Sequence, residues 1–159
     1  MAEQAITVTM KFDLKKITLN LAKELNLAAG MIIKDIVKKN QSGLDVNGNT
    51  IKPLAASTIK AKRAKGSSDP SRALYDTGRM LGRGSAKGVG GRGPYISKRA
   101  SKVDQESHVS VAKDRESIGV YHNEGMKVPK REWFGISKDA IKNIFRMVEL
   151  RIEDMIRRA

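Results

Sequence analysis

The sequence predicts a small α+β protein in which a long N-terminal helix and a C-terminal helix pack against a small antiparallel β-sheet. Two long segments, residues 14–39 and the residues after Ser137, repeat apolar side chains at helical spacing. Shorter segments alternate apolar and polar residues, which is typical of half-buried strands. The 159 residues suit a single domain, 1–159, from which a basic, glycine-rich arm at residues 82–94 extends.

The first predicted element is a strand at residues 5–12, because apolar residues alternate with polar ones there. One face of this strand carries Ile6, Val8, Met10 and Phe12. Asp13 follows at the position of a helix N-cap, so a helix is expected to begin directly after the strand.

The second predicted element is a helix at residues 14–39. Its apolar stripe steps by three and four residues and consists of Leu14, Ile17, Leu21, Leu25, Ala28, Ile32 and Ile36. Gly30 costs this helix about 1 kcal/mol relative to alanine and is a candidate position for a bend. Four further apolar residues lie off the stripe, namely Leu19, Leu27, Ile33 and Val37. Either they contact another subunit, or a sheet covers one side of the helix and a second helix covers the other.

The middle of the chain is predicted to hold short elements joined by loops. The stretch "LDVNGNTI" predicts a hairpin closed by Asn47-Gly48, since both positions accept a positive φ. A short basic helix is expected at residues 55–65, "AASTIKAKRAK", and another helical segment at residues 72–81. Residues 82–94 are rich in glycine and basic residues, which predicts a mobile arm that orders only on binding.

The last third of the chain predicts a β-meander followed by a helix. Three alternating segments, 95–101, 106–112 and 116–123, indicate the strands. An irregular connector at residues 124–137 carries the only tryptophan and leads to Ser137, the expected N-cap of the final helix. The apolar face of that helix is narrow and consists of Ile141, Ile144, Phe145, Val148, Ile152, Met155 and Ile156.

Positive charge is concentrated in the central third of the chain. The net charge is +14, and residues 51–102 carry thirteen Lys and Arg against two acids, Asp69 and Asp76, which gives +11. Such a field favours an acidic partner, either nucleic acid or an acidic protein surface. The alternative is a solvated loop that happens to be basic.

The residues that could carry chemistry do not form a reaction site in the sequence. Cysteine is absent, which excludes disulfides and thiolate metal sites and fits a reducing cytoplasm. His108 and His122 lie in predicted strands without further ligands at metal spacing, and no nucleophile or phosphate-loop motif is present. No secretion signal or membrane span is indicated either. We therefore expect a protein that is not an enzyme and that binds no metal or cofactor.

Five blocks of the sequence, taken in order, resemble the phage virion morphogenesis proteins, a tail-completion and neck family of tailed bacteriophages. The blocks are Lys52-Pro53-Leu54, Ser57-Thr58-Ile59, Leu74-Tyr75-Asp76-Thr77-Gly78-Arg79-Met80, Val120-Tyr121-His122-Asn123-Glu124-Gly125 and Pro129-Lys130-Arg131-Glu132-Trp133-Phe134-Gly135-Ile136-Ser137. The resemblance extends over about residues 5–158. It departs from the family pattern at Ile51, where an aromatic residue is common, and at Ala55 and Ala56, where the family usually has serine and proline.

The resemblance implies a structural component of the virion, assembled in the host cytoplasm. It implies a homo-oligomer, a hexameric ring, that joins the tail terminator or tail tube protein to the head–tail connector. The basic arm would then either cover an acidic neighbour or line a channel through which DNA passes. The alternative function is a nucleic-acid-binding protein that uses residues 51–102 as its basic surface.

Residues within these blocks and the arm are the candidate contact sites. Subunit or partner contacts are expected at Lys52, Pro53, Leu54, Thr58, Asp76, Thr77, Gly78 and Arg79. Contacts of the basic arm are expected at Arg83, Lys87, Arg92, Lys98 and Arg99. Arg79 is either an interface anchor or part of an ordinary helix that breaks at Gly78. Trp133 and Phe134 are expected to anchor the core of the domain.

Overall fold

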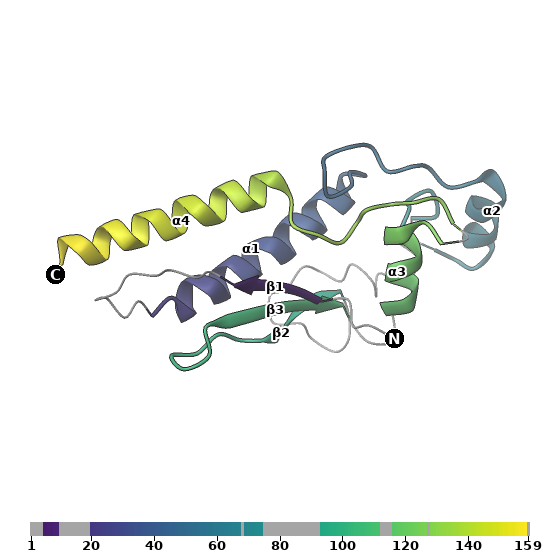
Figure 1. Cartoon of the computed structure of the whole chain (residues 1–159). Helices are drawn as coiled ribbons and strands as arrows, with labels where there is room; N and C mark the ends of the chain where they lie inside the picture. Colours follow the sequence, from purple (N-terminus) through teal and green to yellow (C-terminus); the bar gives the residue numbers. More distant parts are fainter. Residues whose placement is uncertain are drawn as a thin grey trace.

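The computed structural model describes residues 5–9, 20–67, 69–74, 93–111, 116–126 and 128–158 (Figure 1). Over these residues it confirms an α+β fold with a three-stranded antiparallel sheet and four helices. The strands are β1 (Ala5–Thr9), β2 (Pro94–Lys98) and β3 (Glu106–Val111). The helices are α1 (Ala22–Gln41), α2 (Ala56–Ala64), α3 (Glu116–Glu124) and α4 (Lys138–Arg157).

The sheet has the order β1-β3-β2, so the first strand of the chain pairs with the last. Ala5 lies opposite Ser110 and Thr9 opposite Glu106, whereas β2 pairs with the other edge of β3. The prediction that residues 116–123 form the third strand is wrong, since β1 takes that place in the sheet. Gly93 and Pro94, the last two residues of the predicted arm, are buried, and Pro94 begins β2.

Residues 116–124 form helix α3 because three of their groups hold the connector on one helical face. Gly119, His122 and Asn123, which are three and four residues apart, each hydrogen bond with a connector residue. Short apolar runs are ambiguous between the periods of helix and strand, and the alternation of Ile118 and Val120 is misleading here. His122 therefore lies on a helix, contrary to the prediction of a strand.

Helix α1 lies between the sheet and α4, so both of its sides are covered (Figure 1). Ile33 and Val37, two of its off-stripe residues, are buried within the chain. These two residues therefore give no support to a contact with another subunit. For them the other interpretation is correct, in which the sheet covers one side of the helix and a second helix covers the other. Leu27 is different, because its side chain is 51% exposed.

Polar contacts determine the register of α1 on both of its neighbours. On the sheet side, the Asn26 side chain accepts from the N–H of Ala100 at 2.9 Å and donates to the carbonyl oxygen of Ala100 at 3.0 Å. On the other side, the buried carboxylate of Glu24 lies 3.0 Å from Arg151 of α4. Lys39 lies 3.5 Å from Asp139 at the opposite end of α1, so α1 and α4 run antiparallel.

Helix α4 begins where the sequence predicts. The Ser137 hydroxyl accepts a hydrogen bond from the N–H of Ala140 at 3.1 Å, which is the geometry of an N-cap. Asp139 lies in the first turn, where a negative charge is favourable next to the helix dipole. Ile144 and Val148 are buried against α1.

The hairpin at residues 44–50 forms, but with a different turn from the predicted one. Leu44 pairs with Thr50, and the N–H of Asp45 donates to Asn49. Gly48 has a φ of +87°, whereas Asn47 is not in the left-handed region. The loop is therefore a three-residue loop that ends in a left-handed glycine, and the Asp45 carboxylate stabilises it by accepting from the N–H groups of Asn47 and Asn49.

Several predictions fall on residues outside the described ranges. They are the end of the first strand and the start of the first helix (10–19), most of the helical segment at 72–81 and the arm residues before 93. Within the described part, the predicted first helix begins at Ala22 and the basic helix of residues 55–65 is found as α2. None of the described helices is both long and apolar enough to span a lipid bilayer.

Candidate interaction site

The side chain of Arg131 joins its own connector to α3 and to the distant loop before α2. Its Nε donates to the carbonyl oxygen of Lys52 at 3.0 Å, and its two Nη groups reach the carbonyl oxygens of Pro53 and Pro129 at 3.4 and 3.3 Å. One Nη also lies 3.3 Å from Nδ1 of His122 on α3. A guanidinium group suits this role because its donors form a fixed planar fork. We call this set of contacts the Arg131 network.

The Arg131 network contains a buried cation next to a histidine. Arg131 is almost fully buried, and this burial lowers the pKa of its guanidinium, which remains charged in proteins. The pKa of His122 is lowered, first by burial and second by the nearby charge of Arg131. A neutral imidazole can accept a hydrogen bond at Nδ1 from Arg131, whereas a protonated imidazole would present a second donor and a second positive charge.

The lowered pKa of His122 predicts that the protein loses stability in mild acid. Below the ordinary histidine pKa, the unfolded chain takes up a proton more readily than the folded chain, so the free energy of unfolding falls as pH falls through the folded-state pKa. Substitution of His122 by asparagine retains an acceptor but removes the titration. Denaturant unfolding at pH 7.5 and 5.5 should therefore show a smaller difference for His122→Asn than for the wild type, and equal differences would contradict the prediction.

The two connector aromatics lie in the core and position α3. Trp133 is fully buried, and its Nε1–H donates to the carbonyl oxygen of Gly119 at 3.0 Å. Phe134 is buried beside it, with ring centroids 5.5 Å apart, and its N–H donates to Oδ1 of Asn123. Both aromatics bond to α3 and belong to the same core cluster as the buried residues of α1, so they fix the position of the connector between these two helices.

The hairpin attaches to the same connector. The N–H of Val46 donates to the carbonyl oxygen of Glu132 at 2.7 Å, and Nδ2 of Asn47 donates to the Glu132 carboxylate at 2.6 Å. The buried Asn40 at the end of α1 donates to the carbonyl oxygen of Trp133 at 3.1 Å. Hairpin, α1, α3 and connector are therefore joined by hydrogen bonds, and we call them the platform.

Gly125 ends α3 at a position where no other residue fits. Its φ is +77°, and a Cβ there would lie 2.9 Å from Cβ of Lys130 and 3.2 Å from two Lys130 backbone atoms. Gly125→Ala is expected to lower the free energy of unfolding by about 1–3 kcal/mol, because strain and steric overlap add. Gly43→Ala is the matched control, since Gly43 has a φ of +70° but nothing within 4 Å of an added Cβ. Thermal unfolding should show a clearly smaller loss for Gly43→Ala, and equal losses would contradict the steric argument.

Helix α2 projects from this platform and buries none of its residues. It has no side-chain cap, because Ala55 occupies the N-cap position. Its charged residues are all basic, and they are Lys60, Lys62 and Arg63, followed by Lys65. Lys62 donates to the carbonyl oxygen of Arg72 at 2.8 Å, which holds the next loop against the helix. A helix this short, in which Ile59 and Lys62 are only half-buried, gains little stability from packing.

Four of the predicted contact residues lie together, beside or on α2. Lys52, Pro53 and Thr58 are exposed beside or on α2, Leu54 is half-buried, and the backbone of Lys52 and Pro53 is held by Arg131. Residues 76–79 and the arm residues Arg83, Lys87 and Arg92 lie outside the described residues.

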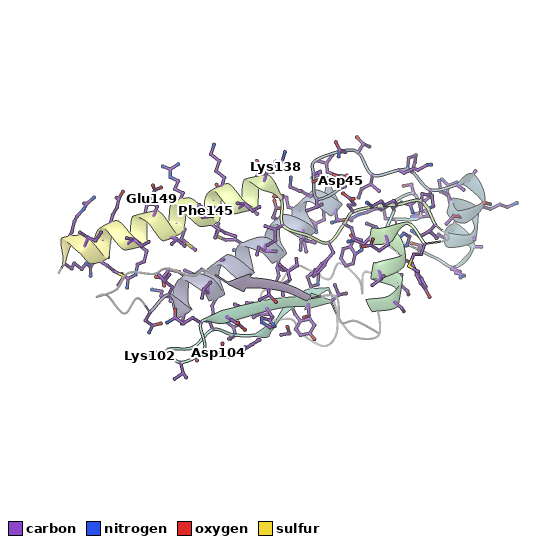
Figure 2. The ribbon with its side chains drawn as sticks, viewed as in Figure 1. Asp45, Lys102, Asp104, Lys138, Phe145 and Glu149 are labelled. Atoms are coloured by element: carbon purple, nitrogen blue, oxygen red, sulfur yellow. The ribbon has the colours of Figure 1, made fainter. Side chains whose placement is uncertain are left out.

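The basic residues of 51–102 that the structure describes do not form one surface. Lys98 and Arg99 belong to the end of the β2–β3 hairpin, and Lys98 pairs with Asp104 at 2.7 Å and with Glu106 at 3.0 Å. Both partners raise the pKa of Lys98, the hydrogen bond with Asp104 most strongly. In Figures 1 and 2 this hairpin end, labelled by Lys102 and Asp104, lies at the opposite end of the molecule from α2. The described basic surface is therefore centred on α2.

Sequence reasoning did not single out Arg131 or His122 as a connected pair. Both residues stand in the blocks quoted above, but nothing in their spacing from Lys52-Pro53 indicates that the three are in contact. Within the described ranges, no group of three or more His, Asp or Glu side chains is placed to hold a metal ion. The site presents the exposed basic side chains of α2 next to the backbone groups that Arg131 holds.

Comparison of the chain with protein-family models, with curated proteins and with solved structures finds no match.

Proposed function

We propose that this chain is a structural virion component of a tailed bacteriophage, a tail-completion or neck protein at the head–tail junction. In this proposal the chain forms a homo-oligomeric ring, sixfold by resemblance, between the tail terminator or tail tube and the head connector. The observation that carries the proposal is the ordered set of five sequence blocks. The first, fourth and fifth blocks meet in the Arg131 network. Arg131 and Lys52 are 79 positions apart, so this contact supports the interpretation that the blocks act together in one structure.

The exposed helix α2 is the contact surface in this proposal. It projects from the platform and carries positive charge, so it suits an acidic surface on a neighbouring subunit or on a partner protein. Ring contacts are head-to-tail, and a ring can therefore use α2 on one side of each subunit against a different surface of the next.

Light scattering after size exclusion and negative-stain imaging of the purified full chain test the proposal. We expect the wild type to form rings. The rings should persist in Lys34→Glu, a change at an exposed residue of α1, and should be lost in Arg63→Glu, a change on α2. A chain that stays monomeric over the whole concentration range and is absent from purified phage particles would overturn it.

The second candidate function is nucleic-acid binding through α2 and the other basic residues of 51–102. The unburied basic helix favours it, whereas the separation of Lys98 and Arg99 from α2 counts against a single groove. Phosphate contacts would make the affinity for duplex DNA fall by a factor on the order of 10³ or more between about 50 and 200 mM salt. Tight, salt-dependent binding by a monomer would favour this function over the ring.

A further inference from the structure

Helix α4 carries an apolar surface that stays exposed in the part of the chain that the structure describes. Its side toward α1 buries Ala140, Ile144 and Val148. A neighbouring stripe stays exposed, with Ile141 at 41%, Phe145 at 64% and Ile156 at 64%, and Ile152 between them half-buried. At 100° per residue these four side chains lie within about 60° of each other. We call them the outer stripe of α4.

The position of α4 explains why the outer stripe is uncovered. Arg151 lies beside Glu24 in the first turn of α1, so the turns after Arg151 extend past the end of that helix. Figure 1 shows the C-terminal part of α4 projecting from the body of the protein, away from α2 and α3. The outer stripe is thus accessible over about 22 Å, the length of fifteen residues of α-helix.

The spacing of the outer stripe is the same when it is read in either direction. The steps from Ile141 to Phe145, Ile152 and Ile156 are four, seven and four residues, so the centre of the stripe lies between residues 148 and 149. A second copy of the helix, turned to run antiparallel, therefore presents its own stripe in register. Ile141 then faces Ile156 of the second copy, and Phe145 faces Ile152 of the second copy.

The charges along one flank of the outer stripe are complementary under the same rotation. Exposed cations occupy the N-terminal half of this flank, at Lys138, Lys142 and Arg146, and exposed acids occupy the C-terminal half, at Glu149 and Glu153 (Figure 2 labels Lys138, Phe145 and Glu149). In an antiparallel pair, Lys142 lies within one helical turn of Glu153 of the second copy, and Arg146 within one turn of Glu149. A parallel pair would instead set this flank against the opposite flank of the second copy, so these cations and acids would not meet.

We propose that α4 is a self-pairing surface, which binds α4 of a second copy of this chain antiparallel about a twofold axis. Apolar spacing and charge order both select the same partner, and one surface serves both copies, as an isologous contact requires. Arg157 lies 3.7 Å from Glu153 in the single chain, and this exposed pair is weak enough to be exchanged for Lys142 of the second copy. The contact is separate from a head-to-tail ring contact at α2 and does not depend on the proposed function.

Sedimentation velocity of the full chain over a concentration series tests the pairing with a matched control on the same helix. Phe145→Glu lies in the outer stripe, whereas Leu150→Glu changes a residue that is 56% exposed on the opposite side of α4. We expect the wild type and Leu150→Glu to form dimers, or larger species built from dimers, and Phe145→Glu to weaken the association at least tenfold. A wild-type monomer up to about 100 µM, or equal behaviour of the two variants, would overturn the proposal; 100 µM corresponds to a free energy of only about −5.5 kcal/mol.

Cross-linking tests the direction of the pair, because the chain contains no cysteine of its own. Glu149→Cys lies on the charged flank, level with the centre of the stripe, so two copies should be joined efficiently by a short bis-maleimide. Ile141→Cys should not be joined to itself, but should be joined to Ile156→Cys when the two variants are mixed. Efficient self-linking of Ile141→Cys would show a parallel contact and overturn the proposal. If α4 pairs form but no rings that depend on α2 are found, the result counts against the proposed ring and leaves the α4 pairing standing.

Discussion

Trp133→Ala is expected to lower the free energy of unfolding by about 3–5 kcal/mol, the largest effect of any single substitution considered for this chain. The indole is fully buried at the meeting point of α1, α3 and the connector, and its removal leaves a cavity lined by all three. The carbonyl oxygen of Gly119 also loses its donor. Guanidinium unfolding followed by circular dichroism measures the loss.

Two further variants separate the cavity from the hydrogen bond. Trp133→Phe keeps most of the apolar volume but removes the Nε1–H, so it should cost about 1–2 kcal/mol. Leu150→Ala removes an exposed apolar side chain from α4 and should change stability by less than about 0.5 kcal/mol. If Trp133→Ala were no more destabilising than Leu150→Ala, the connector would not be part of the core.

Arg131→Ala is expected to cost about 3 kcal/mol, because it removes the donor that three backbone carbonyl groups share. Arg131→Lys should recover little of this loss, since an ammonium group is a point charge and cannot reproduce the planar fork. Chemical denaturation measures both variants, and Trp133, the only tryptophan, reports on the neighbouring backbone by fluorescence.

Hydrogen exchange at individual segments distinguishes the loss of the Arg131 network from a general loss of stability. Hydrogen exchange should become faster in residues 52–65 of Arg131→Ala, because the loop before α2 is released from the platform. The central part of α1 is covered on both sides. Its amides should therefore exchange only through global unfolding, at a rate set by the free energy of unfolding. Unchanged exchange at residues 52–65 would show that Arg131 does not hold α2 in place.

The sequence predicts the elements whose period is unambiguous. The two long helices, β2, β3 and the Ser137 cap follow from repeated spacing and from one hydroxyl at the right position. The sequence-based prediction is wrong at α3, because five or six alternating residues fit a strand as well as a helix. The contacts of Gly119, His122 and Asn123 decide for the helix. The prediction is also wrong at the turn of the hairpin, where the Asp45 side chain selects a longer loop.

The candidate site is harder to predict because it depends on pairing between distant segments. Nothing in the spacing of Lys52, His122 and Arg131 indicates that one guanidinium joins them. Excess apolar surface was predicted on the first helix, but Ile33 and Val37 are buried within the chain, whereas the outer stripe on α4 remains exposed. A periodic pattern shows that a face is apolar, and only tertiary structure shows which part of that face is covered.

The pairing of β1 with β3 has a consequence for how the chain reaches this structure. Ala5 lies opposite Ser110, so closing this ladder brings together strands about 100 residues apart, while β2 and β3 are neighbours along the chain. We expect the β2–β3 hairpin and α1 to form early and β1 to dock late, with a folding rate limited by that distant search. During synthesis on the ribosome, the N-terminal strand must wait until β3 has emerged, and until then its hydrogen-bonding edge is open to chaperones or to the wrong neighbour.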